Sequence, residues 1–108
     1  MVGLDYDGVY GSNFRPEIGT DFIIVTGRTR EELKETLAEV DGEAAIYLRP
    51  FGYPGDRHAA GIWKGGMVKL CSLTHFYEDD SVQAEIIKTI NPNCKVMKVV
   101  NGKLIGEW

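Results

Sequence analysis

The chain has little that would place it in a membrane or outside the cell. None of its apolar runs approaches the ~20 residues that a membrane-spanning helix requires, and there is no charged-then-apolar leader. Its two cysteines, Cys71 and Cys94, lie far apart without the spacing of a metal or redox motif, so we expect buried, reduced thiols rather than a disulfide. The first apolar run begins almost at Met1, so we expect no targeting segment. These absences favour an intracellular, cytoplasmic protein.

The sequence also lacks an excess of positive charge, internal repeats and low-complexity tracts. The formal net charge of −4 argues against a protein that binds duplex nucleic acid through nonspecific phosphate contacts. With 108 residues, of which 44% are apolar, the chain is long enough for one hydrophobic core and too apolar for a disordered segment. No stretch has the composition of an inter-domain linker. We therefore predict a single domain that spans residues 1–108.

Short apolar runs alternate with helical patterns along the chain. Strands are predicted at residues 1–5, 22–25, 44–48, 73–77 and 94–100, and the run at 44–48 has the composition of a buried parallel strand. Helices are predicted at residues 58–70, where three glycines favour an irregularity near Gly65, and at residues 82–90. Asn101-Gly102 is typical of a two-residue hairpin turn, from which a further strand returns through residues 103–108.

A capping box opens the first predicted helix. The side chain of Thr29 and that of Glu32, three residues later, can each accept a hydrogen bond from the other's backbone N–H group. Apolar residues then recur at helical spacing up to residue 40. Asp41-Gly42 is expected to end this helix, which therefore covers residues 29–41 without interruption.

Two carboxylates follow the first predicted strand. Asp5 ends the apolar run and Asp7 lies two residues later, so on an extended chain both point to the same face. Gly8 then lets the chain turn sharply. Two acidic groups this close repel each other unless a cation lies between them or one takes a proton. The pattern indicates either a divalent-cation site at the sheet edge where α/β proteins bind ligands, or an ordinary Asp-Gly turn.

Three further signals follow in order along the chain. The second strand is followed by a threonine and a glycine, a lysine precedes the fourth strand, and that strand ends in an acidic trio: Thr26-Gly27-Arg28, Lys64 and Glu78-Asp79-Asp80. Together with Asp5, Asp7 and Gly8, this ordered set resembles the haloacid dehalogenase (HAD) superfamily of phosphohydrolases. The resemblance covers residues 5–80, about three quarters of the chain.

The resemblance implies a phosphatase that works through an aspartyl phosphate. In such an enzyme Asp5 is the nucleophile that attacks phosphorus. Asp7 protonates the leaving alkoxide and later deprotonates the attacking water. The Thr26 hydroxyl and the Gly27 backbone N–H donate to phosphate oxygens, and Lys64 offsets the clustered negative charge.

The resemblance also implies a Mg²⁺ ion as cofactor. Its ligands are Asp5, the backbone carbonyl of Asp7 and one carboxylate of the acidic trio. The functional pair is either Asp79-Asp80 or Glu78-Asp79, and Asp79 belongs to both, so we take it as the metal ligand. Asp80 also fits the role of N-cap for the helix that follows.

Three basic residues near these positions have competing interpretations. Lys64 has the spacing to the fourth strand that HAD proteins show, and we favour it over Lys69 as the functional lysine. Either lysine is otherwise a solvated helix residue. Arg28 is expected to be a surface or helix-start residue rather than a catalytic group.

The connection after the first strand limits the architecture. Residues 10–20 are rich in Gly, Pro and Asn, lack helical periodicity and are predicted to be a loop or a small hairpin. HAD proteins often carry a helix and a cap domain at this point, and there is room for neither. We therefore predict an α/β fold with a Rossmann-like, mostly parallel sheet of about five strands flanked by helices, with no cap domain and a C-terminal hairpin.

An uncapped catalytic edge favours a bulky phosphorylated substrate, such as a nucleotide, a nucleic-acid end or a phosphoprotein. Arg49 and the run Gly55-Asp56-Arg57, both ahead of the lysine, resemble the 3′-phosphatase part of polynucleotide kinases. Arg49 or Arg57 is therefore a candidate contact for a substrate phosphate, and both are taken as substrate-binding residues. An aromatic ring can stack on a nucleobase, which makes Phe51 or Tyr53 a candidate for that role. The alternative is that these aromatic side chains close a loop over the core.

Two other functions fit part of the pattern. A receiver-like phospho-acceptor domain also combines clustered aspartates with a threonine and a lysine, although in a different order along the chain. A non-catalytic HAD-like binding module would keep the fold without the turnover. In each case we expect no membrane partner, and a monomer or a small homo-oligomer.

Overall fold

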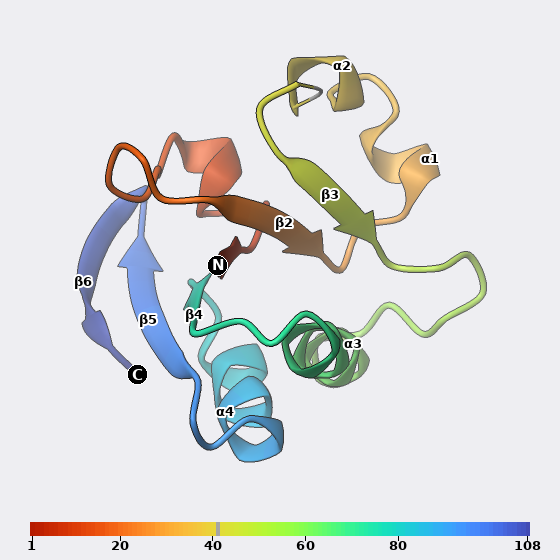
Figure 1. Cartoon of the computed structure of the whole chain (residues 1–108). Helices are drawn as coiled ribbons and strands as arrows, with labels where there is room; N and C mark the ends of the chain where they lie inside the picture. Colours follow the sequence, from red (N-terminus) through yellow and green to blue (C-terminus); the bar gives the residue numbers. More distant parts are fainter. Residues whose placement is uncertain (41) are drawn as a thin grey trace.

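A computed structural model describes residues 1–40 and 42–108, which form one six-stranded sheet with helices on both sides (Figure 1). The strands are β1 (Val2–Leu4), β2 (Phe22–Thr26), β3 (Ala45–Leu48), β4 (His75–Glu78), β5 (Lys95–Val100) and β6 (Lys103–Glu107). Their order across the sheet is β3-β2-β1-β4-β5-β6. All neighbouring pairs are parallel except β5 and β6, which form an antiparallel hairpin. The predicted α/β fold with a mostly parallel sheet and a C-terminal hairpin is confirmed, and the predicted return strand is the sixth strand of the sheet.

The sheet separates two hydrophobic layers. On one side lie α3 (Arg57–Leu70) and α4 (Ser81–Ile90), and on the other lie the 3₁₀ turn η1 (Tyr10–Ser12), α1 (Arg30–Leu33) and α2 (Leu37–Val40) (Figure 1). Side chains of a strand alternate between the layers. Ile23 and Val25 of β2 therefore pack with Phe76 in the layer under α3 and α4, whereas Ile24 packs with Leu4 in the other.

Two glycines let α3 and α4 pack closely. The sequence predicts an irregularity near Gly65, but α3 runs unbroken from Arg57 to Leu70, so that expectation is wrong. A Cβ atom at Gly61 would lie 3.0 Å from Ile86 of α4, and one at Gly65 would lie 2.7 Å from Ile90. These positions, four residues apart on one face of α3, accept the α4 side chains where a larger residue would clash.

The predicted helix over residues 29–41 is divided. Its capping box is present, because Thr29 accepts from the Glu32 backbone N–H and Glu32 from that of Thr29. The first helix ends at Leu33, however, and a second begins only at Leu37. Between them, the backbone N–H and the hydroxyl of Thr36 both donate to the Leu33 carbonyl, at 2.9 and 3.0 Å, which satisfies that carbonyl without the regular helical bond. The predicted stop at Asp41 lies outside the described residues.

One other local prediction needs correction, and one alternative is resolved. The run at residues 44–48 does form a parallel strand, but β3 is the edge of the sheet, and Ala45 and Tyr47 are exposed rather than buried. Its apolar composition is typical of a buried strand, and only its place in the sheet leaves one face uncovered. Of the two alternatives for residues 10–20, the structure shows the loop, which contains η1 and no hairpin.

The structure leaves both cysteines without a disulfide. Cys71 and Cys94 are half-buried and pack against the layer under α3 and α4. Burial raises the pKa of the Cys94 thiol to about 11, so this thiol stays protonated at neutral pH.

In residues 1–40 and 42–108, no helix has both the length and the apolar character to cross a membrane.

A polar contact ties the loop after β1 to the chain ahead of β3. The Tyr10 hydroxyl donates to the Glu43 carboxylate, and Arg15 Nε donates to the same carboxylate at 2.7 Å. The Arg15 guanidinium also lies 3.6 Å from the centroid of the Tyr10 ring. Burial, together with the bond to Glu43, raises the pKa of Tyr10 to about 12.

The substitution Tyr10→Phe tests this contact through its pH dependence. The pKa of Tyr10 is near 10 in the unfolded chain and about 12 in the folded protein. The stabilisation that this group gives the wild type is therefore fully present below pH 10 and is lost as the pH rises to 12. At about 1.4 kcal/mol for each pKa unit, this loss is at most about 3 kcal/mol. Urea unfolding at several pH values should show the wild type losing more stability than Tyr10→Phe over this interval. Parallel curves for the two proteins would contradict the assignment.

Candidate functional site

The carboxyl ends of three adjacent strands bring the main polar residues together. The sheet register pairs Leu4 of β1 with Ile24 of β2 and Tyr77 of β4. The Asp5 backbone N–H donates to the Tyr77 carbonyl at 3.0 Å, which extends the ladder by one residue and places Asp5 beside Glu78. This is the edge at which open α/β sheets bind ligands.

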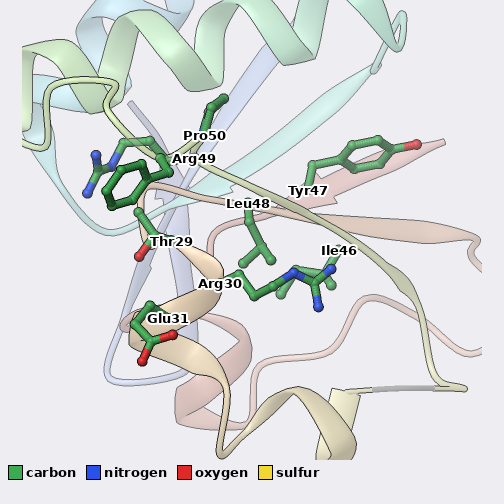
Figure 2. Close-up of a pocket in the computed structure, with 9 residues that line it drawn as sticks. Thr29, Arg30, Glu31, Ile46, Tyr47, Leu48, Arg49 and Pro50 are labelled. Carbon is green, nitrogen blue, oxygen red and sulfur yellow. The ribbon is translucent and has the colours of Figure 1, made fainter.

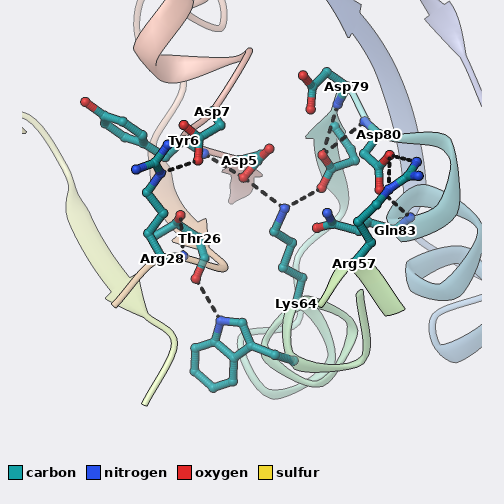
Figure 3. A network of polar contacts seen from close by, with 12 residues as sticks. Asp5, Tyr6, Asp7, Thr26, Arg28, Arg57, Lys64, Asp79, Asp80 and Gln83 are labelled. Carbon is teal, nitrogen blue, oxygen red and sulfur yellow. Dashed lines mark hydrogen bonds and ion pairs between the residues drawn. The ribbon is translucent and has the colours of Figure 1, made fainter. Parts of the chain in front are cut away.

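Lys64 reaches this edge from α3 and pairs with two carboxylates. Its Nζ lies 2.9 Å from Asp5 Oδ1 and 2.8 Å from Glu78 Oε2 (Figure 3). All three side chains are buried, with exposed fractions of 3% for Lys64, 5% for Asp5 and 0% for Glu78. The competing Lys69 is exposed in the last turn of α3. The structure therefore brings Lys64 into the site and leaves Lys69 outside it.

The ionisation of these groups reflects burial and mutual charge. Burial alone would lower the pKa of Lys64, but attraction to Asp5 and Glu78 outweighs it and raises the pKa of Lys64 above its usual value. Burial raises the pKa of Asp5 and, together with repulsion from Asp5, raises that of Glu78 well above its usual range, although Lys64 opposes both rises. Two buried carboxylates thus share one ammonium group, so the site is short of positive charge.

A third carboxylate completes an acidic cluster that fits a divalent cation. Carboxylate oxygens of Asp5, Glu78 and Asp79 all lie within 4.8 Å of one another. An all-oxygen donor set of this kind suits a hard ion such as Mg²⁺. Within the described part of the chain, one buried side-chain oxygen has no hydrogen-bond partner, Oε1 of Gln83, and this residue lines the same cavity. The residues present therefore fit a hydrated cation, because its water ligands can donate to such an oxygen.

The three acidic residues at the end of β4, Glu78, Asp79 and Asp80, have different roles. Glu78 accepts the backbone N–H groups of Asp79 and Asp80 on Oε1, at 3.1 and 3.2 Å, while Oε2 accepts from Lys64. Asp80 is the N-cap of α4, where it accepts the Gln83 backbone N–H at 3.1 Å. The carboxylates that gather are therefore those of Glu78 and Asp79, with Asp80 used as a cap, the second role considered for it from sequence.

Asp7 and Arg28 lie together on the wall of the site. Arg28 Nε donates to Asp7 Oδ2 at 2.7 Å, and the pair is about half-exposed (Figure 3). The Asp7 carboxylate therefore faces Arg28 and is not part of the acidic cluster. Arg28 was expected only to be a surface or helix-start residue. Its position directly after the strand-end Thr26-Gly27 is the signal that could have identified it as part of the wall.

Thr26 is the last residue of β2, and Gly27 follows it at the same edge of the sheet as Asp5. Thr26 has no exposed surface, and its Oγ1 accepts the Arg28 backbone N–H at 3.1 Å, which leaves the hydroxyl proton free to be donated. Gly27 lines the cavity, and its carbonyl accepts from Arg49 Nε at 2.6 Å. Arg49 is thereby fixed in the wall.

Acidic and basic side chains meet in one cavity of about 320 Å³. Its charged lining residues are Asp5, Asp7, Glu32, Asp79, Arg28, Arg49, Arg57 and Lys64. Arg57, predicted to bind substrate, lies in this lining and pairs there with Asp80. Every charged residue predicted from sequence to act in the site is therefore found in this one lining.

A second cavity adjoins the first through Arg49. It has a volume of about 550 Å³ and lies between the beginning of α1 and the edge strand β3 (Figure 2). Its wall includes Arg30, Leu48 and Phe51, and the Phe51 side chain is 98% exposed. Tyr53, the other aromatic residue of this loop, instead packs beside Trp63, with ring centroids 6.3 Å apart.

Comparison with known proteins gives no relative: no family model matches the chain, and no curated protein or solved structure matches it.

Gly8→Ala tests whether the close approach of Gly8 to Asp79 is needed to position the Asp79 carboxylate. Gly8 has φ of +76°, and a Cβ atom there would lie 1.9 Å from Asp79 Oδ2. The added methyl group should push this carboxylate out of the cluster and weaken Mg²⁺ binding about tenfold or more, as measured by calorimetric titration.

Gly19→Ala is the matched control. Gly19 also has a positive φ, of +91°, but nothing lies within 4 Å of the position of its Cβ. Both variants should lose about 1 kcal/mol or more of stability to backbone strain. Only Gly8→Ala should lose cation affinity, and equal affinities in the two variants would contradict this role for Gly8.

Proposed function

We propose that this protein is a Mg²⁺-dependent phosphomonoester hydrolase that works through an aspartyl phosphate on Asp5. The observation that carries the proposal is the position of Asp5. Its carboxylate stands at the carboxyl edge of a parallel sheet, pairs with Lys64 at 2.9 Å and belongs to a cluster that fits a divalent cation. Phosphoryl transfer needs an in-line nucleophile and groups that spread negative charge, and this arrangement supplies both.

In the first step an Asp5 carboxylate oxygen attacks phosphorus and the ester P–O bond breaks. For this step Asp7 carries a proton on its carboxyl group, which lies 2.7 Å from Arg28 Nε, and it gives this proton to the leaving alkoxide. The Thr26 hydroxyl and the Gly27 backbone N–H bind phosphate oxygens. Lys64 keeps its positive charge throughout and compensates the carboxylates around it.

In the second step Asp7 accepts a proton from a water molecule, which attacks the phosphorus of the aspartyl phosphate. The bond between phosphorus and Asp5 breaks, so that inorganic phosphate leaves and Asp5 is regenerated. Bound Mg²⁺, held by Asp5 and Asp79 with the backbone carbonyl of Asp7, would neutralise charge on the phosphoryl group.

The surroundings of the site support a bulky leaving group. The catalytic cavity shares Arg49 with a second one of about 550 Å³, and the exposed Phe51 also lines this second cavity. An aromatic ring and a guanidinium can stack on a nucleobase. Nucleotides and nucleic-acid ends are therefore the substrates that we favour.

Asp5→Asn tests the nucleophile. Lys64 keeps Glu78 as its partner in this variant, so the fold should be retained, whereas turnover should fall by at least about a thousandfold because the amide cannot form the acyl phosphate. The measurement is Mg²⁺-dependent phosphate release from a panel of nucleotides, sugar phosphates, 3′-phosphorylated oligonucleotides and phosphopeptides, with thermal unfolding as the control.

Three results would count against this assignment. Undiminished phosphate release by Asp5→Asn would exclude Asp5 as the nucleophile. A wild-type phosphorylated form that persists without turnover would favour a receiver-like phospho-acceptor. No release from any substrate of the panel would favour a binding module.

Asp79→Asn and Asp80→Asn form a second, matched test. Removal of the Asp79 carboxylate charge should raise the Mg²⁺ concentration needed for half-maximal activity about tenfold or more. Asp80→Asn keeps an N-cap residue and should leave that concentration within about twofold of wild type. A larger effect at Asp80 than at Asp79 would show that the assignment of the pair is wrong.

A further inference from the structure

Both tryptophans of the chain donate their indole N–H to the last carbonyl of a strand that flanks β1. Trp63 Nε1, on α3, donates to the Thr26 carbonyl at the end of β2, at 2.9 Å. Trp108 Nε1, which follows β6, donates to the Glu78 carbonyl at the end of β4, at 3.0 Å. Thr26 and Glu78 have no exposed surface, and a buried carbonyl without a partner costs about 1–3 kcal/mol.

These carbonyls belong to the peptide groups that border the site. The Thr26 carbonyl shares a planar peptide with the Gly27 N–H, and no cis peptide bond occurs in the described residues. In a trans peptide the C=O and N–H point in opposite directions. A carbonyl that is held toward Trp63 therefore turns the Gly27 N–H away from the indole, and Gly27 lines the catalytic cavity.

The same relation holds on the other side of Asp5. The Glu78 carbonyl shares its peptide with the Asp79 N–H, which donates to Glu78 Oε1 at 3.1 Å. Rotation of this peptide would break the Trp108 bond and the Asp79 bond together. Trp108 is itself held in place, because its backbone N–H donates to Val96 at 2.9 Å and Lys98 Nζ lies 4.6 Å from its ring centroid.

We propose that Trp63 and Trp108 are positioning residues that fix two separate halves of the site. Trp63 aims the Gly27 N–H for phosphate, and Trp108 holds the Glu78–Asp79 peptide, and with it the Asp79 carboxylate, for the cation. This inference rests on the proposed function, because it assigns each indole to one of the two ligands. Each tryptophan acts through a neighbouring peptide group and touches neither ligand.

The wild-type protein allows a first test without any variant. Its two indole N–H groups give separate signals in a ¹H–¹⁵N correlation spectrum. Addition of Mg²⁺ alone should shift the Trp108 indole signal more than that of Trp63. Addition of inorganic phosphate at saturating Mg²⁺ should then shift the Trp63 indole signal more. Equal shifts of both signals in both titrations would overturn the division between the two indoles.

Trp63→Phe and Trp108→Phe supply the second test, each as the control for the other. Both keep an aromatic ring and lose the N–H donor. By calorimetric titration, Trp108→Phe should weaken Mg²⁺ binding about tenfold while phosphate affinity at saturating Mg²⁺ stays within about twofold of wild type. Trp63→Phe should show the reverse pattern. A merely structural role would lower thermal stability in both variants without this crossed pattern.

The outcomes separate the two claims. If the wild type binds both ions and the variants lose both affinities together, or neither, the positioning inference is overturned while the proposed function stands. If the wild type binds neither ion, the proposed function is contradicted, and the inference that rests on it falls as well.

Discussion

Lys64 places one ammonium group between the carboxylates of Asp5 and Glu78, in a position almost without contact with water. Breaking a buried pair of this kind by removal of one partner typically costs about 3–5 kcal/mol, because it leaves uncompensated charge in the interior. The fold holds the carboxylates and the lysine together through two different parts of the structure. β1 and β4 bring the two carboxylates level, and an unbroken α3, packed closely on α4 through Gly61 and Gly65, delivers the lysine.

The same interaction explains why the edge suits a cation and a phosphate. One ammonium does not balance the buried Asp5 and Glu78 together with Asp79 beside them, so the cluster gains when a divalent ion binds. An anion placed there would otherwise meet three carboxylates. With an ion bound and Arg28, Arg49 and Arg57 in the surrounding wall, a phosphate group meets mostly positive charge and N–H donors. The charges that hold the fold at this edge are thus the same charges on which the proposed phosphoryl chemistry depends.

Much of this structure could be predicted from local sequence patterns, whereas the rest depends on tertiary contacts. The strand ends at Asp5, Thr26 and the acidic trio follow from short apolar runs that stop at polar residues, so their convergence at one sheet edge could be predicted. The break after Leu33 could not, because it depends on which carbonyl the Thr36 hydroxyl contacts. The exposure of β3 depends on its place at the sheet edge, which composition does not encode. Nor does helical spacing indicate that Trp63 donates its indole N–H to a strand end.

The most direct test of the central claim is a crystal structure of the wild-type protein grown with Mg²⁺ and beryllium fluoride, which mimics a phosphoryl group on an aspartate. We predict a trifluoroberyllate bonded to an Asp5 carboxylate oxygen, with a cation that both Asp5 and Asp79 ligate and with Lys64 still paired to Glu78. A cation bound elsewhere, or an Asp5 carboxylate that carries no beryllium fluoride while another residue does, would contradict it.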